Sequence, residues 1–252
     1  MTRLGGLVGD VAGLAWIPDR SMVATASKKD GTIRLWDASS GELVHLIETE
    51  QQVVSDIDFS PDGTRILGTF SERGIGVWDT QTGQPLFWIP EQLEEENAWA
   101  FWSSDGSAIL GFFENWKQKS DNNCFPLTRF VVYDGFTGNV LYFINDHYSD
   151  VGPIANILNH EKTRILLWQR IEDGYVGPYG LSWDTFIGKV IDWQTGEVVA
   201  TLPESYHWLY AIWSMDGSNL ALSDEDDDLI RVWELDSGEL LAEIPLLGDY
   251  HA

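Results

Sequence analysis

Residues 33–41 read Ile-Arg-Leu-Trp-Asp-Ala-Ser-Ser-Gly, and variants of this phrase return along the chain. Each copy holds an aromatic or aliphatic residue, an acid and, a few residues later, a glycine. The copies are Trp36-Asp37 to Gly41, Trp78-Asp79 to Gly83, Tyr133-Asp134 to Gly138, Ile191-Asp192 to Gly196 and Trp233-Glu234 to Gly238. A phrase that recurs at a period of about fifty residues predicts a repeat architecture.

A second phrase alternates with the first. Its copies are Trp16-Ile-Pro-Asp19, Phe59-Ser-Pro-Asp-Gly63, Trp102-Ser-Ser-Asp-Gly106, Leu158-Asn-His-Glu161 and Trp213-Ser-Met-Asp-Gly217. Ser, Asp, Pro and Gly are turn residues, and Gly supplies the positive φ that tight hairpins require. Two alternating turn signals therefore divide each repeat into short segments.

The first repeat, residues 11–49, shows what lies between the turns. Apolar runs at 11–16 and 22–26 flank the first turn, and residues 32–36 alternate polar and apolar side chains, as a half-buried strand does. Residues 43–47 close the repeat after Gly41. The pattern has no helical period, so each repeat is predicted to contain four short strands.

The repeats resemble those of the WD40 family, most clearly in Ile33-Arg-Leu-Trp-Asp37, Ile75-Gly-Val-Trp-Asp79 and Ile230-Arg-Val-Trp-Glu234. The resemblance covers nearly the whole chain and implies a β-propeller, in which each repeat is a four-stranded blade with its innermost strand at a central channel. The Gly-His pair that often opens a WD40 repeat is absent. Only part of the family's polar network is therefore expected, from partners such as Ser27, Asp30 and Trp36.

We expect an all-β propeller of five four-stranded antiparallel blades between an N-terminal tail, 1–10, and a C-terminal tail, 248–252. The predicted blades are 11–50, 51–91, 92–146, 147–203 and 204–247. A closed ring is favoured because repeat arrays gain stability by burying both terminal faces. An open arc, whose exposed edges would invite association, and a piece of a larger ring remain alternatives.

Composition limits the classes of function. Forty acids and 15 bases give a net charge of −25. This charge disfavours binding to nucleic acid and anionic membranes and favours a basic protein or peptide as partner, although a need for solubility alone also explains the charge.

The five histidines and the single cysteine lack metal-site spacing, and neither a phosphate loop nor a nucleophile elbow occurs. We therefore expect no cofactor, metal or catalytic residue. Without a signal peptide or bilayer-length apolar run, a cytoplasmic location is expected, and the oligomeric state is open.

The joints between predicted strands are of two kinds. Those between strands one and two, and between strands three and four, are short in every repeat. Those between strands two and three, and between blades, hold every insertion, the longest being residues 114–124 and 169–184. In a propeller the second kind shares one face of the disc, and repeat proteins commonly bind through such insertions.

This face is expected to bind the partner through acids and aromatic residues, the latter being enriched in recognition hot spots. The predicted binding residues are Glu94, Glu95, Glu96, Trp116, Tyr148, Tyr175, Tyr179, Trp183, Trp208, Asp226, Asp227 and Asp228. Acid runs are also typical of solvated turns, and aromatic residues can serve only to pack an insertion against its own blade.

The favoured function is a non-catalytic protein- or peptide-binding scaffold. The alternative is a five-bladed glycoside hydrolase or carbohydrate-binding protein, since such propellers hold paired carboxylates in an aromatic funnel.

Overall fold

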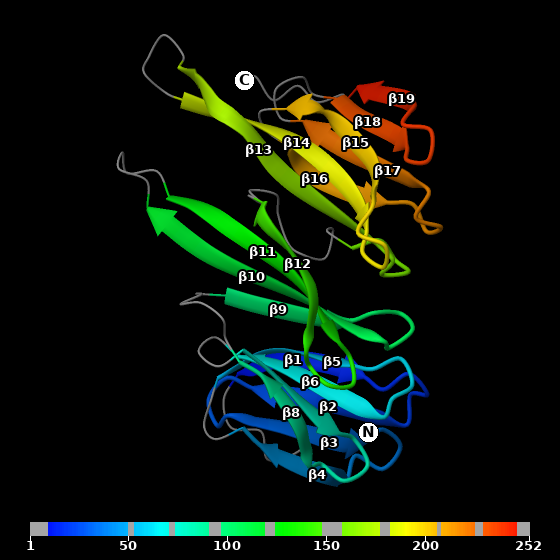
Figure 1. Ribbon diagram of the computed structural model, residues 1–252. Coiled ribbons are helices and arrows are strands. Elements are labelled where there is room, and N and C mark those ends of the chain that lie inside the picture. Colours follow the sequence, from blue (N-terminus) through cyan, green and yellow to red (C-terminus); the bar gives the residue numbers. More distant parts are fainter. Residues whose placement is uncertain are drawn as a thin grey trace, which may run out of the picture. The chain divides into compact units, whose positions relative to one another are not determined.

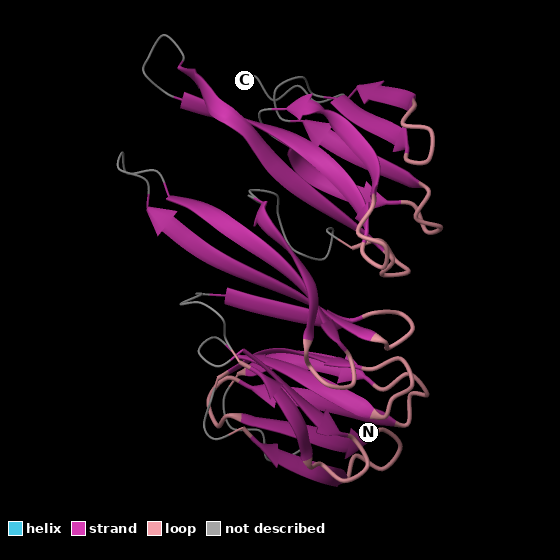
Figure 2. Cartoon of the chain, viewed as in Figure 1, coloured by secondary structure: helices cyan, strands magenta, loops and turns pink. Residues whose placement is uncertain are grey.

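The computed structural model describes residues 10–49, 53–70, 74–90, 97–118, 124–147, 158–176, 182–205, 208–224 and 229–245. Within these ranges the backbone forms strands and turns but no helix, as Figure 2 shows. The described residues consequently contain no helix of a length and hydropathy able to cross a bilayer. The prediction of an all-β chain is confirmed.

The strands form antiparallel sheets in which neighbours in sequence are neighbours in space, and we call each sheet a blade (Figure 1). Blade one contains β1 (Val11–Trp16), β2 (Met22–Ser27), β3 (Thr32–Asp37) and β4 (Leu43–Glu48). Blade two contains β5 (Val54–Phe59), β6 (Arg65–Phe70), β7 (Gly74–Asp79) and β8 (Pro85–Ile89). Blade three contains β9 (Asn97–Trp102), β10 (Ala108–Gln118), β11 (Cys124–Asp134) and β12 (Val140–His147).

Blades four and five complete the described chain. Blade four contains β13 (Arg164–Val176), β14 (Ser182–Asp192) and β15 (Val198–Ser205). A single bridge from Leu158 to Ile165 lies beside β13. Blade five contains β16 (Trp208–Trp213), β17 (Asn219–Asp224), β18 (Leu229–Glu234) and β19 (Leu240–Pro245). Blades one, two, three and five thus show the predicted four antiparallel strands.

Contacts divide the chain into two compact units. The first comprises residues 1–124 and 128–145, and the second comprises 125–127 and 146–252. Blades one to three belong essentially to the first unit, and blades four and five belong to the second. The blade boundaries, the number of blades in the assembled disc and the closure of a ring stay predictions.

The recurring acid of the first phrase caps the turn between the third and fourth strands. Asp37 Oδ1 accepts hydrogen bonds from the backbone N–H groups of Ser39 (3.0 Å) and Ser40 (2.7 Å) and from both hydroxyls. Gly41, at φ +74°, donates its N–H to the Asp37 carbonyl at 2.8 Å. The two backbone N–H bonds to the acid recur around Asp79, Asp134 and Asp192. The phrase recurs because this turn needs an acceptor side chain and a positive φ.

The second phrase builds the turn between the first two strands of a blade. Asp62 Oδ1 accepts from the Ser60 hydroxyl at 2.6 Å and from the Thr64 N–H at 3.0 Å, and Gly63 has φ +71°. In blades one and four the matching left-handed position is held by Arg20 (φ 61°) and Lys162 (φ 51°). These two turns therefore carry backbone strain that glycine avoids elsewhere.

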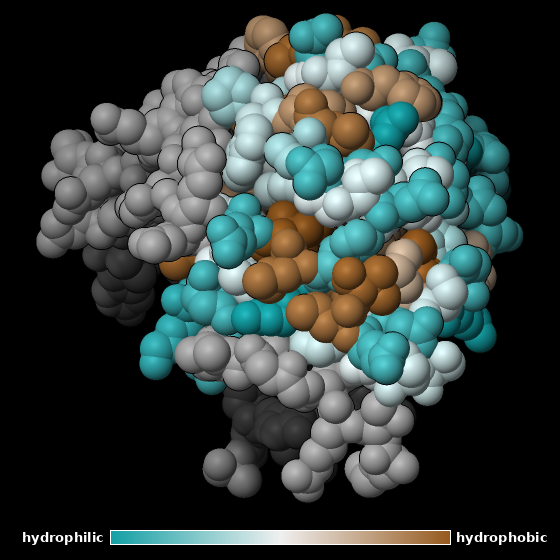
Figure 3. Space-filling view, turned by 90° about the horizontal axis from the view of Figure 1, so that it is seen from below, coloured by the Kyte–Doolittle hydropathy of each residue, from teal (hydrophilic) through white to brown (hydrophobic). Residues whose placement is uncertain are grey.

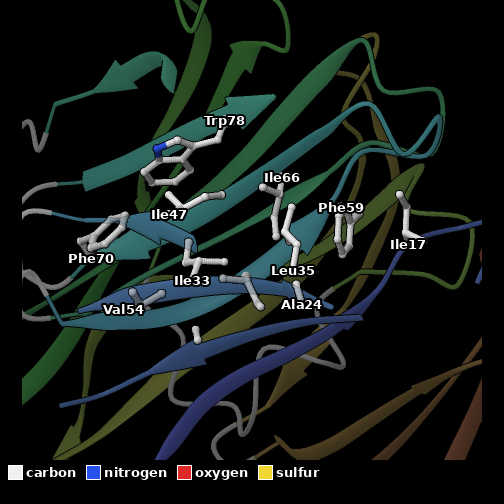
Figure 4. Packing of buried hydrophobic residues seen from close by; sticks show 12 residues of the cluster. Ile17, Ala24, Ile33, Leu35, Ile47, Val54, Phe59, Ile66, Phe70 and Trp78 are labelled. Atoms are coloured by element: carbon white, nitrogen blue, oxygen red, sulfur yellow. The ribbon is translucent and has the colours of Figure 1, made fainter. Parts of the chain in front are cut away.

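The blades within a unit pack face to face through apolar side chains. In the first unit, Ile33, Leu35 and Ile47 of blade one meet Phe59 and Trp78 of blade two in one buried cluster, which Figure 4 shows. In the second unit, a cluster of the same kind joins blades four and five. Its buried members are Leu166, Trp168, Val190, Ala200, Leu202, Ala211, Leu220, Leu222 and Leu235. This apolar burial is the main stabilising contribution between blades.

Blade one holds part of the polar network that the family resemblance implies. Trp36 Nε1 donates to Thr25 Oγ1 at 2.9 Å, and both side chains are buried. Asp30 pairs with Arg34 at 2.8 Å and accepts from the Thr32 hydroxyl at 2.6 Å. An arginine and two threonines thus complete the polar contacts in a repeat without the histidine.

The insertions of blades three and four differ from the expected loops. The strands β10 and β11 each have 11 residues, β13 has 13 and β14 has 11, compared with six in each strand of blade one. Much of the inserted sequence therefore lengthens hairpins, because pairing satisfies the backbone N–H and C=O groups that a loop would leave to solvent. The aromatic and β-branched residues of these segments also favour strands.

Candidate functional site

Most of the predicted binding residues lie outside the described residues. These are Glu94, Glu95, Glu96, Tyr148, Tyr179, Asp226, Asp227 and Asp228. Both acid clusters belong to this set, so their part in binding stays a prediction.

The other four predicted residues lie on strands. Trp116 belongs to β10, beyond Glu114, which is the last position paired with β9. Tyr175 of β13 and Trp183 of β14 are register partners, one pair before the hairpin's last, Val176 with Ser182. Trp208 opens β16, opposite Asp224 of β17. The backbone therefore places two of the predicted binding residues, Tyr175 and Trp183, directly opposite each other on neighbouring strands.

The hairpin of β13 and β14 extends past its neighbour in the sheet. β15 pairs with β14 only as far as Phe186, whereas β13 continues to pair with it out to Ser182. Register shifts occur on either side of Glu172, and such irregularities bend a ribbon and are common near functional sites. Figure 1 shows the long hairpins of blades three and four, in green and yellow-green. The end of β13–β14 is thus a two-stranded ribbon that carries a predicted aromatic pair.

Two acids on the first strand of blade two were not among the predicted site residues. Asp58 Oδ2 accepts the backbone N–H of Trp102 at 3.0 Å, and this bond links β5 to β9. Asp56 is half-buried; burial raises the pKa of its carboxyl, which the backbone N–H of Ile57 opposes and the charge of Asp58 reinforces. Their alternation in Val54-Ser-Asp-Ile-Asp-Phe59 was the signal that could have identified them.

A hollow of about 780 Å³ lies on the short-turn side of blade one, where no site was predicted. Its lining residues are Trp16, Arg20, Ala38 and Ser39. Trp16 ends β1, Arg20 lies in the β1–β2 turn, and Ala38 and Ser39 lie in the β3–β4 turn. Among the described residues no group of three or more His, Cys, Asp or Glu side chains is arranged to hold a metal ion.

Repeated antiparallel blades whose turns are capped by a recurring acid define a WD40-type repeat protein. Residues 5–62 match the family described as the WD40 domain of anaphase-promoting complex subunit 4. Together with the repeats and the WD-repeat relatives below, this match supports a similarity to the WD40 repeat family.

Three curated proteins illustrate the relationship. A WD repeat-containing protein 26 homolog of Arabidopsis thaliana is 23% identical over 250 residues, which cover 90% of this chain and 41% of that protein. A chromatin assembly factor 1 subunit of Gallus gallus is 30% identical over 38% of this chain and 17% of its own length. A eukaryotic translation initiation factor 3 subunit of Pyricularia oryzae is 41% identical over 22% of this chain and 16% of its own. The matches thus span less than half of each of these relatives.

Proposed function

We propose that the chain is a non-catalytic protein-interaction scaffold that binds a basic protein or peptide through its long hairpins and inter-blade joints. The observation that carries this proposal is the contrast between the two kinds of joint. The turns capped by Asp37, Asp79, Asp134 and Asp192 keep one hydrogen-bonded geometry, whereas the hairpins of blades three and four are extended. Variable elements on a regular frame are where repeat proteins commonly bind.

The relatives support a role in assemblies. Two of them are named as subunits, one of a chromatin assembly factor and one of a translation initiation factor. A scaffold function for this chain agrees with those names, and the identity of its partner does not follow from them.

Charge supports a basic partner. A net charge of −25 creates a field that attracts cationic surfaces, and the acid clusters at 94–96 and 226–228 would concentrate it on the binding face. The aromatic residues Trp116, Tyr175 and Trp183 supply the type of side chain that dominates binding hot spots. In this proposal the acids speed the encounter and the aromatic residues hold the complex.

Affinity capture from the source cell, with quantitative mass spectrometry, tests the proposal. The bait is compared with a variant in which residues 94–96 are changed to Gln and 226–228 to Asn. The control is Gln81→Ala, a turn residue of blade two. A basic protein retained by the wild type and the control, but lost from the acid variant, is the expected result. Equal retention by all three baits contradicts the proposed face.

A glycoside hydrolase is the second candidate, and Asp56 is the observation that favours it. A half-buried carboxyl with a raised pKa on a first strand suits a general acid. Turnover of chromogenic glycosides that is lost in Asp56→Asn, with the fold intact, would establish this function. Absence of turnover over a broad glycoside panel counts against it.

A further inference from the structure

The outer edge of blade three is formed by β12, which is the strand at one end of its sheet. An edge strand directs a row of backbone N–H and C=O groups away from its sheet, where another extended chain can pair with them. Val140, Leu141 and Phe143 of this strand are 41%, 55% and 57% exposed. β12 thus offers backbone hydrogen-bonding groups and apolar side chains at the same edge.

Proteins commonly protect such edges with a proline or a charged residue. The outer strands of the other blades each carry one: Glu48 in β4, Pro85 in β8, Pro203 in β15 and Glu243 in β19. In β12, residues 140–145 read Val-Leu-Tyr-Phe-Ile-Asn, and a charged residue, Asp146, follows only after these six. β12 therefore has the longest stretch without either protective residue among the outer strands of the described blades.

The aligned position in blade two shows how Phe143 differs from its counterpart. Counted from the glycine of the turn before each strand, Phe143 aligns with Trp88 of β8. Trp88 is partly buried, and its ring centroid lies 5.2 Å from that of Phe70 and 5.3 Å from that of Trp78. Phe143 is more than half exposed. Blade three thus leaves at its surface an aromatic side chain that blade two packs into its core.

Exposed apolar side chains occur elsewhere on the protein too, and Figure 3 shows a group of them, in brown, among hydrophilic residues. Exposure alone does not mark a binding site, because single apolar residues are normal at a protein surface. β12 differs because its exposed apolar side chains coincide with a strand edge that no proline or charge protects along residues 140–145. Such an edge also sets the conformation of what it binds, since an extended backbone is what pairs with it.

Charge decides between a second copy of the chain and a different partner. A second copy would bring a net charge of −25 to a protein of the same charge, which opposes pairing of one β12 with another. The charged residue that follows the apolar run is itself an acid, Asp146. A basic segment complements both the whole protein and this end of the strand.

We propose that β12 binds an extended basic segment of another protein as a fifth strand of blade three. Alternate apolar residues of the segment pack on Leu141 and Phe143, which share one face of the strand, and Lys or Arg residues flank them. Residues 140–145 pair with about six residues of the segment. This edge is distinct from the acid clusters at 94–96 and 226–228, so it adds a contact to the proposed function without depending on it.

A fluorescent peptide, Lys-Lys-Val-Thr-Ile-Thr-Val-Thr-Lys-Lys, tests the proposal by fluorescence anisotropy with the whole chain. Leu141→Lys adds a charge to the edge and should weaken binding by about tenfold or more. The matched control is Leu86→Lys, at the aligned position of β8, where the leucine is 47% exposed. It should bind the peptide within about twofold of the wild type. Circular dichroism verifies that both variants are folded.

A second peptide separates strand pairing from attraction by charge alone. It has the same sequence with N-methyl groups on its two central residues, which removes a backbone donor from each of its edges and keeps every charge and side chain. Its binding should be about tenfold weaker or less. Hydrogen exchange should slow at residues 140–145 on addition of the first peptide, and exchange in β8 should not change.

Three results would overturn the proposal. Equal binding of the two peptides would show that charge alone holds them. Equal weakening in Leu141→Lys and Leu86→Lys would show that the contact is not specific to β12. A wild-type chain that does not bind the first peptide excludes a basic segment as the occupant, and self-association that Leu141→Lys abolishes would assign the edge to a second copy. The affinity capture described above tests the proposed function separately from all three.

Discussion

The guanidinium of Arg65 lies 4.2 Å from the ring centroid of Phe136, and this contact joins blade two to blade three. Arg65 Nη1 also donates to the Gly135 carbonyl at 2.7 Å. The second unit has an arginine link at the equivalent positions of the repeat, but the partners differ. There Arg164 reaches from blade four to Asp236 of blade five at 2.8 Å. In both units an arginine thus links its blade to the next one, from the start of β6 in the first unit and of β13 in the second.

Arg65→Met should lower the free energy of unfolding by about 1–2 kcal/mol, because it removes a charged hydrogen bond and a cation–π contact. Arg164→Met removes a hydrogen bond to the Gly217 carbonyl (3.1 Å) and the pair with the exposed Asp236 but no aromatic contact, so it should cost less, about 1 kcal/mol. Urea unfolding followed by circular dichroism measures both. A larger loss for Arg164→Met would show that the link does not depend on the aromatic contact.

Glycine at the two strained turn positions should stabilise the protein. Arg20→Gly and Lys162→Gly each relieve a left-handed backbone, and the net gain after the entropy cost of glycine should be about 0.5–1 kcal/mol. Thermal unfolding measures it. The matched control is Gly63→Ala, which should destabilise, since its Cβ would meet Ile17 at 2.9 Å. Loss of stability in both glycine variants would mean that side-chain contacts at these turns outweigh the strain.

The capped turns should make stability sensitive to acid. Hydrogen bonds from Ser39, then from Ser40, lower the pKa of Asp37 from 3.8 to about 2. Because the folded-state pKa lies below the unfolded one, the stabilisation is present above the unfolded value and is lost as the pH falls towards about 2. Asp37→Asn should flatten the stability profile in that window, which urea unfolding at a series of pH values would reveal. An unchanged profile would mean that the charge of Asp37 does not contribute.

Asp56 should act in the opposite sense. Burial raises its pKa, so at neutral pH the folded state holds a charged carboxylate at a cost that protonation removes. Asp56→Asn should therefore raise stability at neutral pH and lose this advantage as the pH falls through the raised folded-state pKa. The same pH series measures it. Destabilisation at neutral pH would show that the carboxylate makes contacts that an amide cannot replace.

The sequence predicted the frame well because its turns are local. Asp37 and Gly41 satisfy one turn with bonds spanning four residues, so the repeat could be recognised without knowing any distant contact. The extended hairpins were not predicted, because pairing such as Tyr175 with Trp183 depends on strand register rather than on a turn motif. The hollow at Trp16 and Arg20 was missed for a related reason: its lining comes from two turns that are separate in sequence and meet only in the folded blade.

Neutralising residues 94–96 and 226–228 together should mainly slow association with a verified basic partner and flatten its dependence on salt. Long-range charge acts on the encounter more than on the lifetime of a complex. Surface plasmon resonance at several salt concentrations separates the two rates. An unchanged association rate would assign these acids to solubility alone.

Trp116→Ala and Trp183→Ala should instead speed dissociation, since aromatic hot spots hold a complex after it has formed. A loss of about 2 kcal/mol or more in binding would mark each as a hot spot. The same resonance experiment supplies the dissociation rates. Unchanged rates in both variants would mean that the hairpin aromatics only stabilise their own ribbon.

The most direct measurement compares the two sides of the blades against one verified partner. Affinity is determined for Trp183→Ala, on the long hairpin of blade four, and for Gln81→Ala, in the short turn of blade two. The proposed function predicts weaker binding for the first variant and wild-type binding for the second. Equal loss in both variants, or loss in Gln81→Ala alone, would contradict the assignment of the binding face.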